Sequence, residues 1–569
     1  MYLIPQVKKS KSCSPFIIEG CTFKCDNVDK RVVNLTQKIQ RGSTNVTFSF
    51  DESVNFSYKM NLSSDLVEII AKDQAGAFYA VQTLRQIIAN KECDLCEIED
   101  TPDYVDRGFY LDITRGRIPK LETLKELVDT LAYYKINMLQ LYVEHTFPFK
   151  EYDGIYQRTG YITPDEIREL DAYCIENFID FVPSLSLFGH LYELLSDDRY
   201  KHLCELVDYK DRAVYWCERM GHHTIDPLNP ESFEIIKSLI DQYVPLFTSD
   251  KFNICCDETF DLCNGRNKGK DKARLYVDFV RKIVDYIKSK GKTPMMWGDI
   301  ISKHADLIDD IGDGVLFLSW GYSKDEKPDA INKVRDAGKP QYVCPGLNNW
   351  TSLIELPQVS VPNITKMTKY GYDAGAIGVL NTCWGDYGHP SSIYMCLYGM
   401  IFGAAKSWNT NCEYEDFDCS MDLLCYGKTG ASEKIKAIAA TLVHCLWSEL
   451  VCGYSNEKFG ADNMKCWGES EPYELSEGFS TIEDIIPYLN VEVWGNEKAR
   501  ENLLCVAQGI QLMQAMLMSK KTGERFGLEL KDAEEWLKEF SRLYLNESKN
   551  GELEELVRVI YYLAKKYLV

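Results

Sequence analysis

The sequence predicts an α/β fold, a (β/α)8 TIM barrel preceded by a small α+β domain and followed by a helix-rich C-terminal domain. Eight short apolar runs alternate with amphipathic stretches between residues 107 and 382, as parallel βα units require. Segments that alternate in polarity come before them, and long helical patterns come after them. The 569 residues suffice for three such units, which we place at 1–103, 104–410 and 411–569.

The first unit has the pattern of strands with one helix. Residues 46–50 and 66–70 alternate in polarity, which predicts strands. From Gln74 to Ile88, apolar residues recur at helical spacing, which predicts a helix with one buried face. The Thr-Pro-Asp segment at 101–103 then marks the boundary with the barrel.

The barrel strands follow in order, with helical patterns between most of them. We predict strands at residues 109–114, 138–143, 181–187, 252–256, 294–297, 316–320, 342–344 and 376–382. The predicted helices between them include 121–134, 165–177 and 272–290. Beyond the barrel, the helical patterns at 435–447, 503–518 and 553–568 predict plain packing helices, to which we assign no chemistry.

The formal net charge of −22 limits the kinds of partner. It argues against nucleic acid and against an anionic membrane, and it fits a neutral ligand better. Residues 1–14 lack the apolar core of an export signal, and the chain has no run of about 18 uncharged apolar residues. We therefore expect a soluble, cytoplasmic protein that is a monomer or a homodimer.

The 21 cysteines are expected to be reduced, small hydrophobic residues in such a chain. Cys93 and Cys96, with Cys21 and Cys25 upstream, give the one pattern that resembles a zinc site. The upstream pair has three intervening residues instead of two, so a zinc site there is the less favoured alternative. We expect no metal and no cofactor.

The adjacent carboxylates Asp257 and Glu258 are the most informative residues of the chain. They follow the fourth predicted strand, at the end of the barrel where active sites lie. An acid that is buried, or that lies beside a like charge, acquires the raised pKa that proton donation near neutral pH requires. The alternative is a solvated pair that caps the next helix.

Further residues of functional types follow the other predicted strands. The polar ones are Asp112 with Arg115, Glu144, His145, His190, Asp299, Asn349 and Asp386. Tryptophans follow four different strands, at Trp297, Trp320, Trp350 and Trp384. Any one of them could plug the barrel mouth, but together they predict a sugar site. Aromatic rings cover the apolar faces of pyranoses, whose hydroxyls need fixed Asp, Arg and Asn partners.

Several segments in their order along the chain carry a family resemblance. They are residues 73–84, Asp106-Arg107-Gly108-Phe109 with Leu111-Asp112 and Arg115, Gly189-His190, Asp226-Pro227 with Asn229-Pro230, Asp257-Glu258, and Trp384-Gly385-Asp386. In these segments the chain resembles glycoside hydrolase family 20, the β-N-acetylhexosaminidases, over most of residues 1–400. Two segments depart from that family. Its usual His-x-Gly-Gly before the Asp-Glu is replaced by residues 253–256 (Asn-Ile-Cys-Cys), and Asn349-Trp350 stands where a tyrosine is expected after strand seven.

The resemblance implies an exo-acting retaining hydrolase that releases terminal β-linked N-acetylglucosamine or N-acetylgalactosamine from an oligosaccharide or glycoconjugate. Its catalysis is substrate-assisted: the 2-acetamido oxygen attacks C1 and forms an oxazolinium ion. Glu258 is then the acid that protonates the glycosidic oxygen and, in the second step, the base. Asp257 orients the acetamide N–H and stabilises the developing charge.

The resemblance also assigns the other site residues. Arg107 is expected to hold the terminal sugar's hydroxyls, with Asp386 accepting from them. Trp297, Trp320 and Trp384 are expected to wall the pocket, with Asn349 and Trp350 near the acetamide. His190 is either a direct catalytic contact or a structural histidine. Asp112, Glu144, His145 and Asp299 are expected to support the residues that contact the sugar. Arg115 is expected to form an ion pair with Asp112 at the rim of the barrel.

Three alternatives stay open at this point. A double-displacement glycosidase would use a second carboxylate about 5 Å from Glu258, with Asp299 or Glu144 as candidates. An exo-β-glucosaminidase would act on the unacetylated sugar. A non-catalytic sugar-binding protein would keep the barrel and the aromatic residues without turnover.

Overall fold

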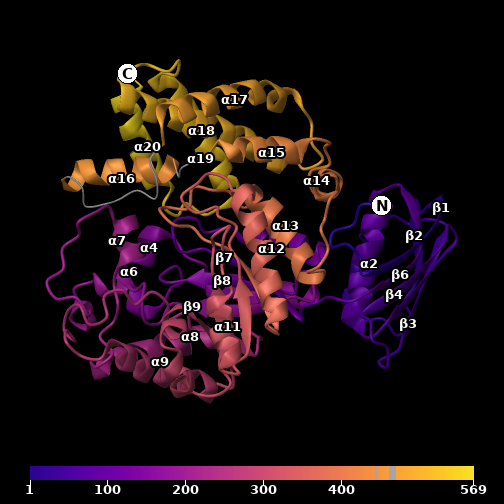
Figure 1. The fold of residues 1–569 in the computed structure, drawn as a ribbon, viewed down its shortest axis with the longest axis horizontal. Helices are drawn as coiled ribbons and strands as arrows, with labels where there is room; N and C mark the ends of the chain where they lie inside the picture. Colours follow the sequence, from indigo (N-terminus) through magenta and orange to yellow (C-terminus); the bar gives the residue numbers. More distant parts are fainter. Residues whose placement is uncertain (442–445, 461–469, 569) are drawn as a thin grey trace.

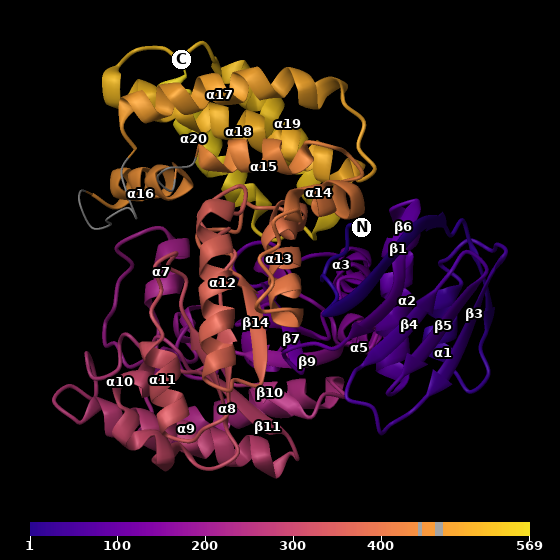
Figure 2. The ribbon, with the colours of Figure 1, turned by 45° about the vertical axis from the view of Figure 1, so that its right-hand side comes forward.

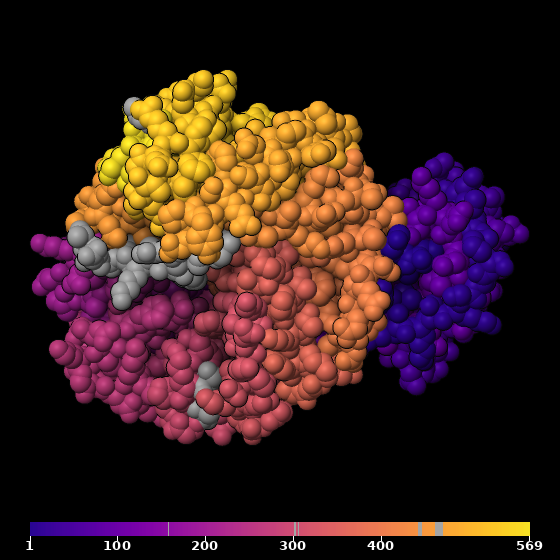
Figure 3. All heavy atoms as spheres, turned by 45° about the horizontal axis from the view of Figure 1, so that its top comes forward, coloured from indigo at the N-terminus to yellow at the C-terminus, as the bar shows by residue number. Residues whose placement is uncertain are grey.

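The computed structural model describes residues 1–441, 446–460 and 470–568. A barrel forms the centre, a six-stranded sheet with two helices lies at its side, and the C-terminal helices cover it from above in Figures 1 and 2. Figure 3 shows the N-terminal part as a lobe that projects from the rest. Within the described ranges, no helix has both the length and the apolar composition of a membrane-spanning segment.

The N-terminal lobe confirms the predicted α+β pattern, but it has two helices where one was predicted. Its sheet has the order β1-β6-β4-β5-β3-β2. The strands are β1 (Lys9–Ile17), β2 (Cys21–Lys24), β3 (Thr44–Phe50), β4 (Tyr58–Leu62), β5 (Leu66–Ala71) and β6 (Glu92–Asp100), with helices α1 (Lys30–Thr36) and α2 (Gln74–Ala89). Helix α2 starts where the Asp73 carboxylate accepts from the Gly76 N–H at 2.7 Å, an N-cap that satisfies a free backbone donor.

The cysteines of this lobe do not form a zinc site. Cys21 lies on β2 at one edge of the sheet, whereas Cys93 and Cys96 lie on β6, with three strands between the two. Within the described part of the chain, no group of potential metal ligands includes them, and the cysteines there form no disulfide bond.

The eight predicted barrel strands are confirmed. They run in parallel and in chain order, and β14 pairs with β7 to close the barrel. The strands are β7 (Asp106–Asp112), β8 (Met138–Val143), β9 (Asp180–Leu185), β10 (Lys251–Asn253), β11 (Thr293–Trp297), β12 (Leu316–Trp320), β13 (Gln341–Cys344) and β14 (Gly378–Cys383). Strand β10 is shorter than predicted, since the chain leaves the sheet after Asn253 and turns sharply toward the carboxylate pair.

Helices surround the barrel between the strands (Figure 2). They are α3 (Leu121–Tyr133), α4 (Tyr156–Thr159), α5 (Pro164–Glu176), α6 (Tyr192–Leu195), α7 (Tyr215–Gly221), α8 (Pro230–Tyr243), α9 (Lys272–Ser289), α10 (Asp299–Lys303), α11 (Asp329–Asp336), α12 (Pro357–Asp373) and α13 (Leu397–Trp408). The predicted helices at 121–134, 165–177 and 272–290 are confirmed as α3, α5 and α9. At the start of α5, Thr163 and Glu166 form a reciprocal capping box, and Pro164 occupies the first helical position. Together they explain the sharp start of this helix.

The C-terminal part is helical, as predicted. Its helices are α14 (Phe417–Met421), α15 (Ala431–Ala440), α16 (Leu446–Phe459), α17 (Pro472–Val491), α18 (Glu497–Thr522), α19 (Leu530–Glu547) and α20 (Leu553–Tyr567). The patterns at 503–518 and 553–568 fall in α18 and α20. The predicted helix at 435–447 is instead the end of α15 and the start of α16, and residues 442–445 lie outside the described ones.

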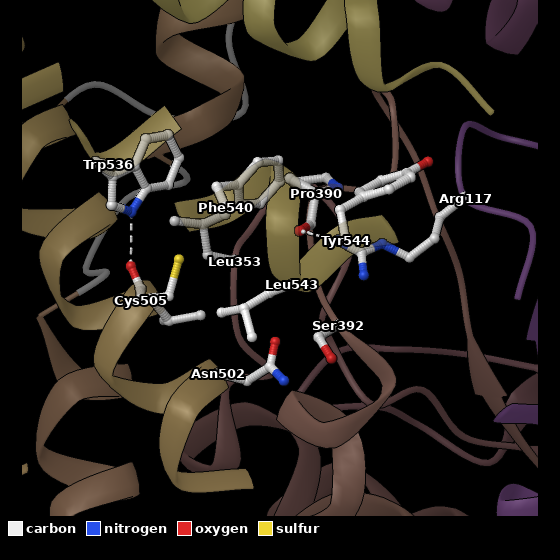
Figure 4. Close-up of a pocket in the computed structure, with 11 residues that line it drawn as sticks. Arg117, Leu353, Pro390, Ser392, Asn502, Cys505, Trp536, Phe540, Leu543 and Tyr544 are labelled. Atoms are coloured by element: carbon white, nitrogen blue, oxygen red, sulfur yellow. Dashed lines mark hydrogen bonds between the residues drawn. The ribbon is translucent and has the colours of Figure 1, made fainter. Parts of the chain in front are cut away.

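The C-terminal helices pack closely on the barrel. Figure 4 shows Leu353, Pro390 and Ser392 of the barrel facing α18 and α19. The gap between them has a volume of about 10 Å³, which leaves room for one water at most. Arg117 reaches across to Glu547 at 3.1 Å, and the contact is buried. The helices are therefore part of the same packed body as the barrel.

Candidate active site

A cavity of about 760 Å³ lies where the barrel strands end. Residues at the carboxyl end of seven of the eight strands, or in the segments that follow them, contribute to its wall, as a site at this end of a barrel requires. The lining residues are Arg115, His190, Cys217, Met220, Gly221, Asp257, Glu258, Phe260, Trp297, Trp320, Tyr322, Asn348, Trp350, Leu356, Val359, Trp384, Asp386 and Tyr387.

A tight turn delivers Asp257 and Glu258 to this cavity. Cys255, Cys256 and Glu258 have φ angles of 56°, 63° and 45°, in the left-handed region that favours glycine. The Asn253 side chain supports the turn, since its Oδ1 accepts from the Cys255 N–H at 2.9 Å. The two cysteines therefore adopt backbone angles that glycine adopts more easily, at a cost in backbone strain.

The pKa values of the two carboxyl groups shift in opposite directions. Burial, together with the neighbouring charge of Glu258, raises the pKa of Asp257. Burial also acts to raise the pKa of Glu258, but the hydrogen bond and charge of His190 outweigh it and the pKa is lowered. We expected a raised pKa for the proton donor. The pKa of Glu258 is lowered instead, so this expectation is wrong for the ligand-free protein.

His190 lies against both carboxylates. Its Nε2 is 3.4 Å from Glu258 Oε2 and 4.0 Å from Asp257 Oδ2. Burial opposes the charged imidazolium, but the hydrogen bond to Glu258 and the charge of Asp257 raise the pKa of His190 to about 9. Near neutral pH the ligand-free site thus holds a proton on His190, next to an ionised Glu258.

Arg115 and Asp386 form the polar end of the cavity. Arg115 Nη1 is 2.9 Å from Asp386 Oδ1, and its Nη2 is 3.5 Å from Glu144 Oε1. The guanidinium lies over the rings of Tyr142 and Trp384, 5.2 Å from each centroid. Burial raises the pKa of Asp386 to about 6, although Arg115 opposes the shift. The expected ion pair of Arg115 with Asp112 is present at 3.5 Å, but the carboxylate nearest to Arg115 is Asp386.

The prediction that Arg107 binds the sugar is wrong. Arg107 lies near the start of β7, at the opposite end of the barrel from the cavity. It is buried, and it donates to the carbonyls of Lys135, Tyr104 and Val105 and to the Tyr79 hydroxyl, at 2.8 to 3.0 Å. Its side chain therefore joins the N-terminal lobe to the barrel, and Arg115 is the arginine of the cavity.

Because the two arginines lie in different places, the same substitution is expected to reduce stability at one and activity at the other. Arg107→Met is expected to destabilise the protein by about 3 kcal/mol, because it leaves buried carbonyls without donors. Arg115→Met is expected to lower kcat/KM on the substrate by about 10²-fold, since it removes a charged donor from the cavity. Urea unfolding and initial-rate kinetics on both variants measure the two effects. A large loss of activity in stable, folded Arg107→Met would contradict the assignment.

Aromatic side chains form most of the cavity wall. Trp297 and Trp384 pack together at 5.6 Å between centroids, and Trp320 stacks on Tyr322 at 5.0 Å. Tyr322 was not predicted. It follows β12, lines the cavity, and its hydroxyl accepts from Trp384 Nε1 at 2.8 Å. Its position after strand six, instead of strand seven, explains why the sequence did not reveal it.

Asn349 does not line the cavity, contrary to prediction. It is fully buried, and its Nδ2 donates to the Trp384 carbonyl at 2.8 Å and to Ser391 Oγ at 3.3 Å. The neighbouring Asn348, with φ 53°, faces the cavity instead, as does Trp350. Asn349 therefore holds the backbone that carries Trp384.

The four predicted supporting residues lie behind the wall. Asp112 accepts from the Arg115 and Gly385 N–H groups at 3.1 and 3.0 Å, which joins the ends of strands one and eight. Glu144 accepts from the Tyr142 hydroxyl at 2.8 Å, and His145 Nδ1 is 3.9 Å from Glu144. Burial and the charges of Asp257 and Glu258 raise the pKa of Asp299 to about 7. None of the four is among the described residues that line the cavity.

The C-terminal helices hold two segments of the cavity wall in place. No sequence pattern indicated this role. Glu552 accepts from Trp216 Nε1 at 2.7 Å and forms an ion pair with Arg219 at 2.6 Å. Both partners lie on α7, whose far end contributes Met220 to the cavity. Trp447 of α16 donates to the carbonyl of Tyr387, another lining residue, at 2.7 Å.

Known proteins give independent comparisons. The family descriptions "Glycosyl hydrolase family 20, catalytic domain" and "Glycosyl hydrolase family 20, domain 2" match residues 104–346 and 32–101. A beta-hexosaminidase of Porphyromonas gingivalis is 27% identical over 278 residues, covering 41% of this chain and 34% of that protein. A beta-hexosaminidase of Emericella nidulans is 24% identical over 368 residues, covering 59% of each. The chain thus spans between about a third and three fifths of these relatives' lengths.

Solved structures share the fold. The chitobiase of Flavobacterium johnsoniae superposes with a TM-score of 0.60 at 16% identity, over 98% of this chain and 99% of that one. The Streptomyces plicatus N-acetyl-beta-hexosaminidase in complex with Thio-NAglucal gives a TM-score of 0.59 at 17% identity, over 76% and 95%. The two family matches fall on the N-terminal sheet and on the barrel that follows it. They show that this chain belongs to glycosyl hydrolase family 20.

Proposed function

We propose that this protein is an exo-acting, retaining β-N-acetylhexosaminidase that removes a terminal β-linked N-acetylglucosamine or N-acetylgalactosamine. The observation that carries the proposal is the placement of Asp257 and Glu258 side by side in an aromatic cavity, with His190 against both. Its substrate is an oligosaccharide or glycoconjugate with such a sugar at its non-reducing end.

The first chemical step uses three groups of the chain. Glu258, with the proton that it shares with His190, protonates the glycosidic oxygen as the bond to C1 breaks. The substrate's 2-acetamido oxygen attacks C1 and closes the oxazolinium ring, while Asp257 accepts from the acetamide N–H and balances the positive charge. In the second step Glu258 takes a proton from water, which opens the ring with overall retention.

The cavity supports this route over double displacement. Among the described residues that line it, the carboxylates are Asp257, Glu258 and Asp386. Asp386 is held by Arg115 at 2.9 Å and so suits the sugar hydroxyls better than C1. Glu144 and Asp299, the candidate nucleophiles of the alternative, lie behind the wall. The acetamide of the substrate is therefore the best-placed nucleophile.

Substrate binding is divided between polar and aromatic groups. Arg115 and Asp386 close one end of the cavity and are positioned to hold the hydroxyls of a terminal ring, as exo action requires. Trp297, Trp320 and Trp384 enclose the acetamide and exclude the water that would compete with it. The Tyr322 hydroxyl takes the role of the missing tyrosine and donates to the acetamide oxygen.

Activity on three p-nitrophenyl β-glycosides tests the proposal. We expect turnover of the N-acetylglucosaminide or its galacto epimer, and a rate on the unacetylated glucosaminide at least about 10³-fold lower, since it lacks the internal nucleophile. Faster cleavage of the unacetylated sugar would identify a β-glucosaminidase. Binding of N-acetylglucosamine without turnover would identify a sugar-binding protein.

His190 predicts a distinctive pH dependence. The pair of His190 and Glu258 holds one proton after Glu258, whose pKa is lowered, has ionised, and it keeps this proton up to about pH 9, where His190 loses it. kcat/KM is therefore expected to fall above about pH 9. In His190→Gln, Glu258 must keep the proton alone, so the alkaline limb is expected to move down by at least about two pH units.

The matched control for this experiment is His202→Gln. His202 is half-exposed, pairs with Glu231 at 2.8 Å and lies outside the cavity. Its substitution should leave the alkaline limb in place. An unchanged limb in active His190→Gln would show that the proton resides elsewhere.

The location inferred from the sequence also stays a proposal. The described cysteines form no disulfide bond, which supports a reducing, cytoplasmic compartment. Cell fractionation tests it, and recovery of the protein from the medium or periplasm would contradict it.

A further inference from the structure

His222, His223 and Asp261 form a cluster of metal-ligand types beside the active-site cavity. The two histidines directly follow α7, and Asp261 lies three residues after Glu258. One ligand atom of each residue lies within 4.8 Å of the other two. No step of the proposed reaction uses these side chains.

The hydrogen bonds of the cluster leave two buried atoms without partners. His222 Nδ1 and Asp261 Oδ1 are 2.8 Å apart. The other carboxylate oxygen, Oδ2, has no hydrogen-bond partner although Asp261 is only 3% exposed. The same holds for Nδ1 of His223, which is 5% exposed. Burying such atoms unsatisfied is costly, and each calls for an explanation such as a bound ion.

The cluster is also accessible from solvent. His223 lines a second cavity of about 710 Å³ together with Tyr192 and Tyr209. The side chain of His222 is 30% exposed to solvent. An ion can therefore reach the cluster, and a water can complete its coordination from the cavity side.

We propose that His222, His223 and Asp261 bind one divalent transition-metal ion of the zinc class. Two imidazoles and one carboxylate are a donor set that suits such ions, whereas Mg²⁺ and Ca²⁺ prefer oxygen ligands alone. Three protein ligands leave a fourth position open for water. The three ligand atoms already lie within 4.8 Å of one another.

The ion would join two segments of the active-site wall. Met220 and Gly221, immediately before the histidines, line the active-site cavity, and so does Phe260, immediately before Asp261. The metal is thus a positioning element between the end of α7 and the loop that carries the catalytic pair. The inference concerns binding and stands whether or not the protein hydrolyses a hexosaminide.

Titration of the full-length, chelator-treated protein with Co²⁺ and Zn²⁺ tests the proposal. Calorimetry gives the stoichiometry, and the absorption of Co²⁺ distinguishes nitrogen and oxygen ligands from the thiolates of this cysteine-rich chain. We expect one ion per chain, without a sulfur-to-metal band, in wild type and in His202→Gln. Asp261→Asn and His223→Ala are each expected to weaken binding by at least about 100-fold.

One further variant and the conservative nature of Asp261→Asn make the outcome decisive. Glu258→Gln removes a ligand of the other possible group, His190 with Asp257 and Glu258, and should leave the affinity unchanged. Asp261→Asn keeps the shape of the side chain, so the test survives if His223→Ala fails to fold by circular dichroism. The proposal is overturned if wild type binds no stoichiometric ion, if folded Asp261→Asn binds as tightly as wild type, or if Glu258→Gln abolishes binding.

Discussion

Glu258→Gln is expected to lower kcat/KM on a β-linked N-acetylglucosamine disaccharide by about 10³- to 10⁴-fold. The amide cannot donate the proton that the leaving sugar alkoxide needs. The loss should shrink when the leaving group is a good one, because 2,4-dinitrophenolate departs without protonation. The effect of the substitution therefore depends on the leaving group.

Initial rates on the disaccharide and on aryl glycosides with leaving groups of graded acidity measure this effect. Plots of log kcat/KM against leaving-group pKa should be steep for Glu258→Gln and shallow for wild type. Equal losses on every substrate would show that Glu258 is not the proton donor.

Asp257→Asn is expected to lower kcat/KM by about 10²- to 10³-fold, with a loss that does not depend on the leaving group. Its carboxylate acts on the acetamide and on the charge that develops at the ring, neither of which changes with the aglycone. Asparagine nearly preserves the shape of the side chain, so positioning by contact alone should survive. The two neighbouring residues thus serve as controls for each other.

The same set of aryl glycosides tests Asp257→Asn, with far-ultraviolet circular dichroism to confirm folding. Parallel plots for wild type and variant, displaced by the predicted factor, would support the acetamide-orienting role. Activity within about threefold of wild type would contradict it.

The barrel was predictable because its signal is local. Strands β8 and β12 have the predicted bounds, since a run of buried apolar residues between helical patterns specifies a parallel strand. Asp257 and Glu258 could be predicted because they directly follow such a strand, and the residues at this end of a barrel form the active site.

The remaining site residues depend on contacts that no local pattern carries. Arg107 and Arg115 lie at opposite ends of the same strand, and only the pairing of β7 with β14 brings Arg115 to Asp386. Tyr322 enters the cavity from the segment after β12. The support that Glu552 gives to α7 spans more than 300 residues of sequence, as its contact with Trp216 shows.

The turn before the catalytic pair shows a conflict between local preference and fold. Cys255 and Cys256 adopt left-handed backbone angles that glycine would adopt without strain. Their side chains are fully buried, and Cys255 Sγ lies 3.4 Å from Ser184 Oγ under the cavity floor. Packing and hydrogen bonding thus offset the strain, which residue preference alone does not predict.

In the proposed reaction the substrate's own acetamide is the nucleophile. The most direct measurement is kcat/KM on p-nitrophenyl glycosides whose N-acetyl group carries zero, one, two or three fluorine atoms. Fluorine withdraws electrons from the carbonyl oxygen that attacks C1, so the account predicts a steep, progressive fall in rate along the series. A rate that stays constant across the four substrates would contradict internal attack and return a carboxylate nucleophile to consideration.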